Sequence, residues 1–217
     1  METESTLGDH PDGRVRRGNA TRRAVLRRAV DVASIEGLDG LSIGRLATEL
    51  SMSKSGLFAL FGAKEQLQLA TIRAAKRIYF DTVVRPALET APGLGRVSAL
   101  LAAWLDYSRE RVFPGGCFFA RTSTEYAARD GAVRDALTTA HYEWLQLIER
   151  SLMEARALGE LDAAESLDQL VFELNAFLDG ANLDSLFDRG DTSYDRASRA
   201  IRDRLRLAAH GHPTTTG

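Results

Sequence analysis

Residues 41–67, LSIGRLATELSMSKSGLFALFGAKEQL, constrain the fold more than any other stretch of the chain. Apolar residues recur at helical spacing on both sides of a three-residue break at 51–53. Ser42 and Ser53 each stand just before a helical run, where a serine oxygen accepts a hydrogen bond from a free backbone N–H. Two short helices joined so tightly predict a helix-turn-helix, and the alternative is an ordinary helical hairpin.

The rest of the chain carries helical periodicity and lacks the alternation of period two that marks strands. A helix is predicted from near Thr21 to Gly37, where glycine suits a left-handed C-terminal position. A longer one starts at Lys64 and is kinked or ended by Pro86. Further helical stretches are predicted at 94–110, 117–128, 132–158, 164–187 and 192–209. We therefore expect an all-α protein of about nine helices, with a three-helix head on a helical body.

The domain boundaries follow from the same pattern. Residues 1–18 are polar and aperiodic and are interpreted as a disordered tail. Residues 19–64 form the helix-turn-helix domain, and residues 65–210 form the body. Residues 211–217 are expected to be a frayed tail.

Composition restricts the compartment. The chain has 217 residues, of which 44% are hydrophobic and 27% charged, as in a globular protein. No run approaches the roughly 18 apolar residues that span a bilayer, so no membrane partner is expected. The first residues lack the apolar core of a secretory signal. Cys117 is the single cysteine, which excludes an internal disulfide and fits a cytoplasmic protein. It is interpreted as a small buried residue, with a redox or electrophile sensor as the alternative.

Charge is distributed unevenly along the chain. The formal net charge is −2, but residues 1–13 carry −4, residues 14–64 carry +6 and the remainder carries −4. A basic N-terminal segment on an acidic body indicates a polyanionic partner for that segment. Arg14, Arg16 and Arg17 form an arm that either contacts DNA or is a solvated tail.

No pattern typical of an enzyme is present. The sequence lacks GxSxG, a P-loop, GxGxxG and HExxH, and the four histidines are scattered, two of them close to the C-terminus. We therefore expect no catalytic residues, no metal and no cofactor.

The head is similar to a known family. VLRRAVDVASIEG, LDGLSIGRLATEL, MSKSGLFALF and AKEQL, in this order over residues 25–67, resemble the DNA-binding domain of TetR-family (tetracycline-repressor-like) transcriptional regulators. PGGCFFA at 114–120 also resembles a segment of one branch of that family. The resemblance implies that the second short helix reads bases and that helix starts meet phosphates. The residues it assigns to DNA contact, together with the neighbouring arginines, are Arg22, Arg23, Ser42, Arg45, Ser53, Lys54, Ser55, Gly56, Phe58, Leu60 and Lys64.

Several positions depart from the family pattern. Phe58 stands where a tyrosine is usual, and Leu60 replaces a frequent histidine, so two polar contacts are lost. One interpretation is that Leu60 packs on a thymine methyl instead, and the alternative is that the contact is simply lost. Ala63 cannot cap the helix that follows, a loss of about 1 kcal/mol. Ser51 takes the place of a common turn glycine.

In the body, the resemblance implies an effector site and a dimer. An apolar or aromatic small molecule is expected among aromatic and polar side chains, although each of these is also a candidate core residue. The pocket residues expected are Trp104, Tyr107, Phe113, Cys117, Phe118, Tyr126, Tyr142, Trp144, Phe172 and Asn175. The last two long helices would pair with their copies through Leu170, Leu174, Phe177, Leu178, Ala181 and Leu205.

These features predict a homodimeric transcriptional regulator that binds double-stranded palindromic operator DNA. We expect a repressor that a small effector releases. The alternatives are an architectural or effector-independent DNA-binding protein and, more remotely, a helical-bundle enzyme.

Overall fold

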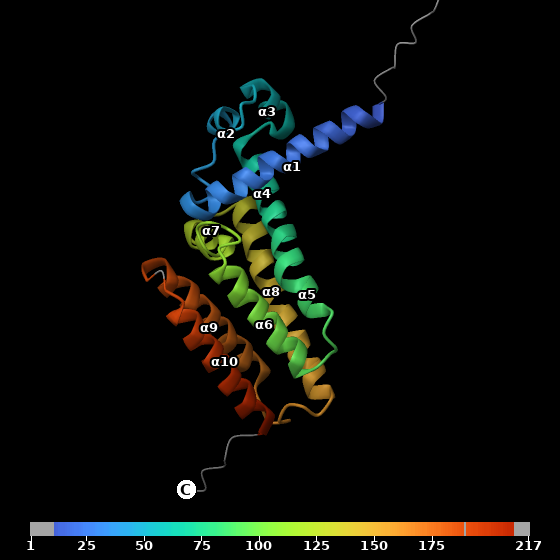
Figure 1. Ribbon diagram of the computed structural model, residues 1–217, viewed down its shortest axis with the longest axis vertical. Coiled ribbons are helices and arrows are strands. Elements are labelled where there is room, and N and C mark those ends of the chain that lie inside the picture. The colour runs from blue at the N-terminus through green and yellow to red at the C-terminus, as the bar shows by residue number, and fades with distance from the viewer. Residues whose placement is uncertain (1–10, 189, 211–217) are drawn as a thin grey trace, which may run out of the picture.

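A computed structural model describes residues 11–188 and 190–210 of the chain, and all of its regular structure is helical. Figure 1 shows an elongated molecule with a small head at one end and a bundle of long helices below it. The helices are α1 (Pro11–Glu36), α2 (Ile43–Glu49), α3 (Lys54–Phe61), α4 (Lys64–Tyr79), the π-helix η1 (Phe80–Val84), α5 (Arg85–Leu88), α6 (Leu94–Arg109), α7 (Phe118–Tyr126), α8 (Ala132–Ala157), α9 (Leu167–Phe187) and α10 (Thr192–His210). Because α4, η1 and α5 follow one another without a break, the described residues form nine helical segments, and the all-α prediction is confirmed.

The first helix is longer than its sequence pattern indicates. It begins at Pro11, so residues 11–18 are helical and the predicted tail of residues 1–18 is wrong over that part. Proline at a helix start is favourable, since its missing N–H needs no partner there. The extension projects beyond the head (Figure 1), and its described side chains are exposed. A helix that packs against nothing needs no apolar face, which is why the sequence there has no apolar periodicity. Residues 1–10, and the frayed tail predicted at 211–217, lie outside the described residues.

The helix that leaves the head changes its winding before it ends. The backbone N–H of Arg85 donates to the carbonyl of Phe80, five residues earlier, which defines the wide turn of η1. Pro86 follows directly and has no N–H to donate, so the wide turn accommodates the interruption. Pro86 therefore does not stop the helix: it lies at the start of α5, directly after the wide turn, and α5 continues to Leu88.

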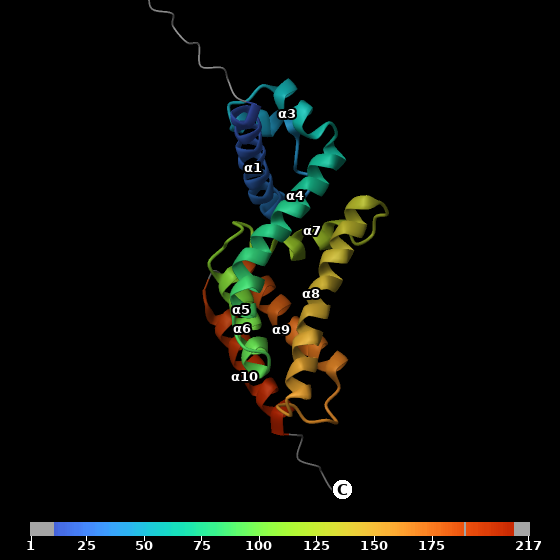
Figure 2. The ribbon, with the colours of Figure 1, turned by 90° about the vertical axis from the view of Figure 1, so that its right-hand side faces the viewer.

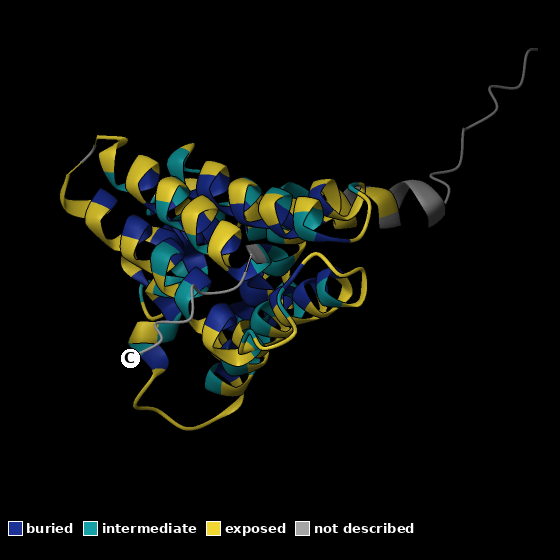
Figure 3. Ribbon diagram, turned by 90° about the horizontal axis from the view of Figure 1, so that it is seen from below, coloured by how far each residue is buried: buried dark blue, intermediate teal, exposed yellow. Residues whose placement is uncertain are grey.

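The body consists of long helices lying roughly along the molecule. Figure 2 shows α8 on one side and α6 with α10 on the other, with α9 between them. Buried residues face inward on these helices and exposed residues face outward (Figure 3). A single cluster of buried side chains extends from Val25 and Leu57 in the head to Leu205 and Ala208 in α10. Head and body therefore share one hydrophobic core. None of the described helices combines the length and apolarity required to span a bilayer.

Candidate nucleic-acid interface and ligand cavity

The start of α3 is an exposed helix N-terminus. Ser53 Oγ accepts from the backbone N–H of Gly56 at 3.1 Å, as predicted for a cap. Lys54 and Ser55 are exposed at the first positions of the helix. A Cβ on Gly56 would come within 2.9 Å of Ser53 Oγ, so glycine keeps this end compact. Free N–H groups beside a lysine favour a phosphate oxygen.

The turn before α3 is tight and strained at one residue. Ser51 has φ of 52°, the left-handed region in which glycine is common. Met52 N–H donates to Ala47 O at 2.8 Å and closes the turn. Ser42 caps α2 by accepting from Arg45 N–H at 3.1 Å, whereas Ala63 gives α4 no side-chain cap. The predictions that Ser42 and Ser53 cap their helices and that Ala63 does not are confirmed.

The exposed face of α3 includes an unusual aromatic residue. Phe58 is 60% exposed, whereas Leu60 is half-buried and packs against the core. The carbonyl of Leu60 accepts from Arg22 Nη1 at 2.7 Å. Phe58 therefore has the larger surface available for a base or sugar.

Two of the arginines assigned to DNA contact hold the head together. The guanidinium of Arg22 lies 4.7 Å from the centroid of the Phe61 ring as well as donating to Leu60. Arg45 is paired with both Glu36 and Glu49. It lowers the pKa of Glu36, whereas the pKa of Glu49 is lowered first by the hydrogen bond from Arg28 and then by that from Arg45. Arg23, by contrast, is exposed. The positive charge of the head is thus partly neutralised by its own acidic residues.

The turn between α1 and α2 is where the head contacts the residues at the end of α7. Glu125, near the end of α7, accepts from the backbone N–H groups of Leu38 and Asp39 at 2.7 and 2.9 Å. Arg129 pairs with Asp39 at 2.7 Å and lowers the pKa of that carboxyl. Lys64, predicted to contact DNA, donates to the carbonyl of Asp39 at 2.7 Å. We call the contacts of Glu125, Tyr126 and Arg129 with Leu38 and Asp39 the α7 clamp.

Tyr126 belongs to this clamp and not to a ligand pocket. Its hydroxyl accepts from Gln68 Nε2 at 2.9 Å and donates to Asp39 Oδ1 at 3.0 Å. Burial, followed by the hydrogen bond to the Asp39 carboxylate, raises the pKa of Tyr126 to about 12. The phenol therefore stays protonated as a donor at neutral pH.

The body contains a cavity of about 860 Å³. Among the predicted pocket residues, Trp104, Cys117, Trp144 and Asn175 line it. Aromatic and apolar side chains that the sequence did not single out complete its wall: Tyr79, Phe80, Val84, Leu88, Phe119, Leu147, Leu183 and Leu186. Its polar and charged lining comprises Lys76, Arg121, His141, Glu143, Arg150, Asp179 and Asn182, with Ser123 and Thr124 of α7.

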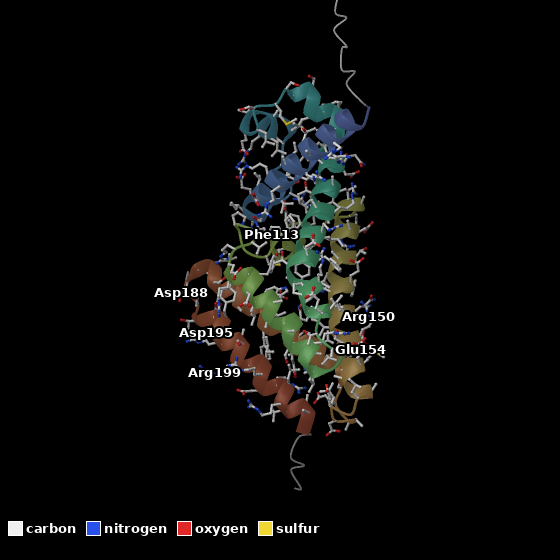
Figure 4. The ribbon with its side chains drawn as sticks, turned by 45° about the vertical axis from the view of Figure 1, so that its right-hand side comes forward. Phe113, Arg150, Glu154, Asp188, Asp195 and Arg199 are labelled. Atoms are coloured by element: carbon white, nitrogen blue, oxygen red, sulfur yellow. The ribbon has the colours of Figure 1, made fainter. Side chains whose placement is uncertain are left out.

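The other predicted pocket residues lie elsewhere. Tyr107, Phe113 and Phe118 are almost completely buried and stack edge-on or tilted against one another in the core. They do not line the cavity, because a ring enclosed by other rings has no surface left for a ligand. Figure 4 shows Phe113 just below the head, above the long helices of the body. Tyr142 and Phe172 line a second hollow of about 590 Å³ that shares Asn175.

Cys117 is buried, and this burial raises the pKa of its thiol. Its backbone N–H donates to Asn182 Oδ1 at 2.9 Å. A protonated thiol is a poor nucleophile, so the interpretation as a small buried residue holds. Cys117 contributes to the cavity wall mainly through shape.

The residues predicted to form the dimer interface are core residues of the chain itself. Leu170, Leu174 and Leu178 are fully buried, Ala181 and Leu205 nearly so, and Phe177 is half-buried. They pack inside the chain, where α9 lies against α6, α8 and α10. The adjacent face of α9 exposes Phe172 (69%), Leu183 (55%) and Phe187 (85%). We call these three residues the α9 stripe.

The comparisons with known proteins agree with this arrangement. The family model for the tetracyclin repressor-like C-terminal domain matches residues 93–201. The chain belongs to the TetR family. It is thus a DNA-binding transcriptional regulator and not an enzyme.

Solved structures share the TetR fold along nearly the whole chain. A TetR regulator from Chloroflexus aurantiacus is 21% identical, with a TM-score of 0.80, over 90% of this chain and 97% of its own. A protein from Saccharomonospora viridis in complex with choline is 20% identical, with a TM-score of 0.75, over 87% and 96%. A TetR-family regulator from Cytophaga hutchinsonii is 16% identical, with a TM-score of 0.78, over 90% and 98%. The comparison with curated proteins returns no match.

Proposed function

We propose that this TetR-family protein is a homodimeric repressor that binds a palindromic operator and is released by a small molecule in the body cavity. The observation that carries the proposal is the position of α7. Phe119, Ala120, Ser123 and Thr124 of this helix line the cavity, and Glu125 and Tyr126 at its end hold the α1–α2 turn. A ligand that moves α7 would therefore also move the head.

For DNA, we propose that α3 enters the major groove, with the capped starts of α2 and α3 at phosphates. Ser42, Ser53 and Lys54 would contact the backbone, while Ser55, Gly56 and Phe58 would face bases. Arg23 is exposed and adds charge from α1, whereas Arg22 and Arg45 act chiefly by supporting the head. Lys64 would reach a phosphate only by leaving Asp39.

The α9 stripe supports a dimer. Exposed large apolar residues on one face of a helix favour burial against another chain, and Leu207 on α10 is also 47% exposed. We propose that α9 and α10 pair with their copies. A dimer of this kind would place two α3 helices in successive major grooves, roughly 34 Å apart.

The need for a small-molecule effector distinguishes the proposed repressor from an architectural DNA-binding protein. A cavity of about 860 Å³ has the size of a site for a drug-sized ligand and is not needed by a protein that only binds DNA. The S. viridis relative is in complex with choline, which supports a ligand-binding body. A ligand weakens DNA binding only as far as it prefers the conformation that does not bind the operator.

Fluorescence anisotropy with labelled DNA flanking the gene tests the proposal. We expect saturable binding that weakens steeply with salt, and competition by the same palindrome but not by random duplex. Lys54→Ala should weaken binding to every sequence, whereas Lys64→Ala should have a smaller direct effect, because its ammonium is engaged by Asp39. Equal affinity for random DNA would contradict a sequence-specific regulator.

A further inference from the structure

The cavity wall contains one acidic group that is partly desolvated and has no lysine or arginine partner among the described residues. Asp179 of α9 lines the cavity, and no lysine or arginine of the described chain forms an ion pair with it. Its Oδ2 accepts from Asn175 Nδ2 at 2.8 Å, and its Oδ1 has no hydrogen bond to a described residue. Burial raises the pKa of Asp179, with the Asn175 amide and nearby His141 acting in the opposite direction. A partly desolvated carboxylate without a counter-charge favours the approach of a cation.

Aromatic rings stand beside this carboxylate. Trp144 Nε1 donates to Asn175 Oδ1 at 3.0 Å, so Asn175 bridges the indole and Asp179. The ring of Tyr79 meets Trp144 and Phe119 edge-on, with centroids 5.6 and 5.7 Å apart. All of these residues line the same cavity.

Tyr79 provides a second unused polar group. Its hydroxyl is buried and has no hydrogen-bond partner. Asp179 is close enough to act on it electrostatically. An unpartnered buried hydroxyl beside a cavity is unfavourable, so its protein surroundings leave one hydrogen bond unmade.

Among the described residues, no basic group of the cavity wall is linked to the aromatic rings as Asp179 is through Asn175. Lys76 is paired with Glu143, which neutralises both. Arg121 and Arg150 are exposed, as Asp179 is, but neither has a hydrogen bond to Asn175 or Trp144. Figure 4 shows Arg150 on α8, on the opposite side of the molecule from Asp188 and Asp195. An anion placed between the rings would also meet their negative faces.

We propose that the effector is an organic cation, a quaternary or protonated amine with an apolar group, whose charge lies between Asp179 and the rings of Tyr79, Phe119 and Trp144. This inference rests on the proposed ligand-responsive function and specifies its ligand class. Ring faces attract a cation, and the carboxylate supplies the counter-charge. The volume of about 860 Å³ leaves room for an apolar group much larger than a methyl.

A charge series on the unmodified protein tests the proposal directly. The probes are phenyltrimethylammonium, its neutral isostere tert-butylbenzene, and the anion 4-tert-butylbenzoate. Both tryptophans of the chain line the cavity, so their fluorescence reports binding. We expect the cation to bind at least about tenfold more tightly than the neutral isostere, with the anion weakest. A neutral or anionic probe that binds as tightly as the cation would overturn the proposal.

Asp179→Asn locates the charge, since it keeps the shape of the side chain. Calorimetry should show a loss of about tenfold or more for the cation and less than about twofold for the neutral isostere. Asp184→Asn, an exposed change on the same helix outside the cavity lining, is the matched control and should change neither affinity. An equal loss for both probes, or no loss for the cation, would contradict the role of Asp179.

The repressor function and the cationic ligand can be tested separately. Asp179→Asn should bind operator DNA like the parent protein when no probe is present, because Asp179 is far from α3. If the parent protein binds its operator and a neutral or anionic compound releases it, the repressor function stands and the cation is wrong. If the parent protein shows no operator preference, the proposed function itself fails.

Discussion

The hydroxyl of Tyr126 on α7 donates a hydrogen bond of 3.0 Å to Oδ1 of Asp39, in the turn that joins α1 to α2. This bond connects the body to the head, and Gln68 of α4 donates to the same hydroxyl. Two helices of the body therefore meet the head at one phenol. Changes in either helix reach the same turn.

Asp39→Asn should reveal a pH-dependent part of the stability. The pKa of Asp39 is lowered in the folded protein, first by the hydrogen bond from Arg129. A lowered pKa stabilises the fold above the unfolded value, near pH 3.9, and this contribution is lost as pH falls through the folded value. Urea unfolding should thus show the parent more stable than the variant at pH 7, with the difference shrinking below about pH 4. A constant difference from pH 7 to pH 2.5 would contradict this account of Asp39.

Ser53 and Ser55 should separate folding from DNA reading. Ser53→Ala removes the cap of α3 and should lower the free energy of unfolding by about 1 kcal/mol. Ser55→Ala removes an exposed hydroxyl whose one contact is a 3.4 Å hydrogen bond to Ser53, so stability should change little while operator preference changes. Thermal unfolding and a binding-site selection measure the two effects. The assignment of roles is wrong if the two variants show the reverse pattern.

Gly115 lies where the loop before α7 touches α1. A Cβ at this position would come within 2.0 Å of the carbonyl oxygen of Ser34, and the Gly115 N–H donates to Ser34 Oγ at 3.1 Å. Gly115→Ala should therefore cost about 1–3 kcal/mol by separating the loop from the helix. Gly95→Ala is the control, because its Cβ would meet only Thr90 at 3.9 Å and would favour α6 by roughly 0.5–1 kcal/mol. Denaturant midpoints compare the two.

The exposed apolar residues of α9 and α10 should control assembly, whereas the buried leucines of α9 control folding. Phe187→Asp with Leu207→Asp, both outside the cavity lining, should give a monomer of 23.8 kDa by light scattering, with the helical content kept. Leu174→Ala should instead lower the stability by about 2–5 kcal/mol, because Leu174 is fully buried within its own chain. A dimer that survives both charged substitutions would exclude this face as the interface.

The head was predictable from sequence because its signals are local. The caps at Ser42 and Ser53 and the missing cap at Ala63 each depend on neighbouring residues alone. The start of α1 was missed because residues 11–18 have no apolar face, so periodicity carried no signal there. Proline at position 11 was the one available clue.

The body was less predictable because its contacts are long-range. Residue type could not distinguish Trp144, which lines the cavity, from Tyr107, which other rings enclose. In α9, periodicity identified the apolar face of Leu170 and Leu174, but it could not show that this face packs within the chain. The more exposed Phe172 and Phe187 were the better candidates for contact with a second chain.

The wide turn of η1 has a consequence for the whole helix from Lys64 to Leu88. One additional residue in a helix turns everything after it by about 100° relative to an uninterrupted α-helix. The part before η1 faces the head and the part after it faces α6, and Phe80 and Val84 at the change line the cavity. The side chains of α4 and of α5 therefore project in different directions, and the wide turn fixes the angle between them. The number of residues in this turn thus sets the rotation of α5 relative to α4.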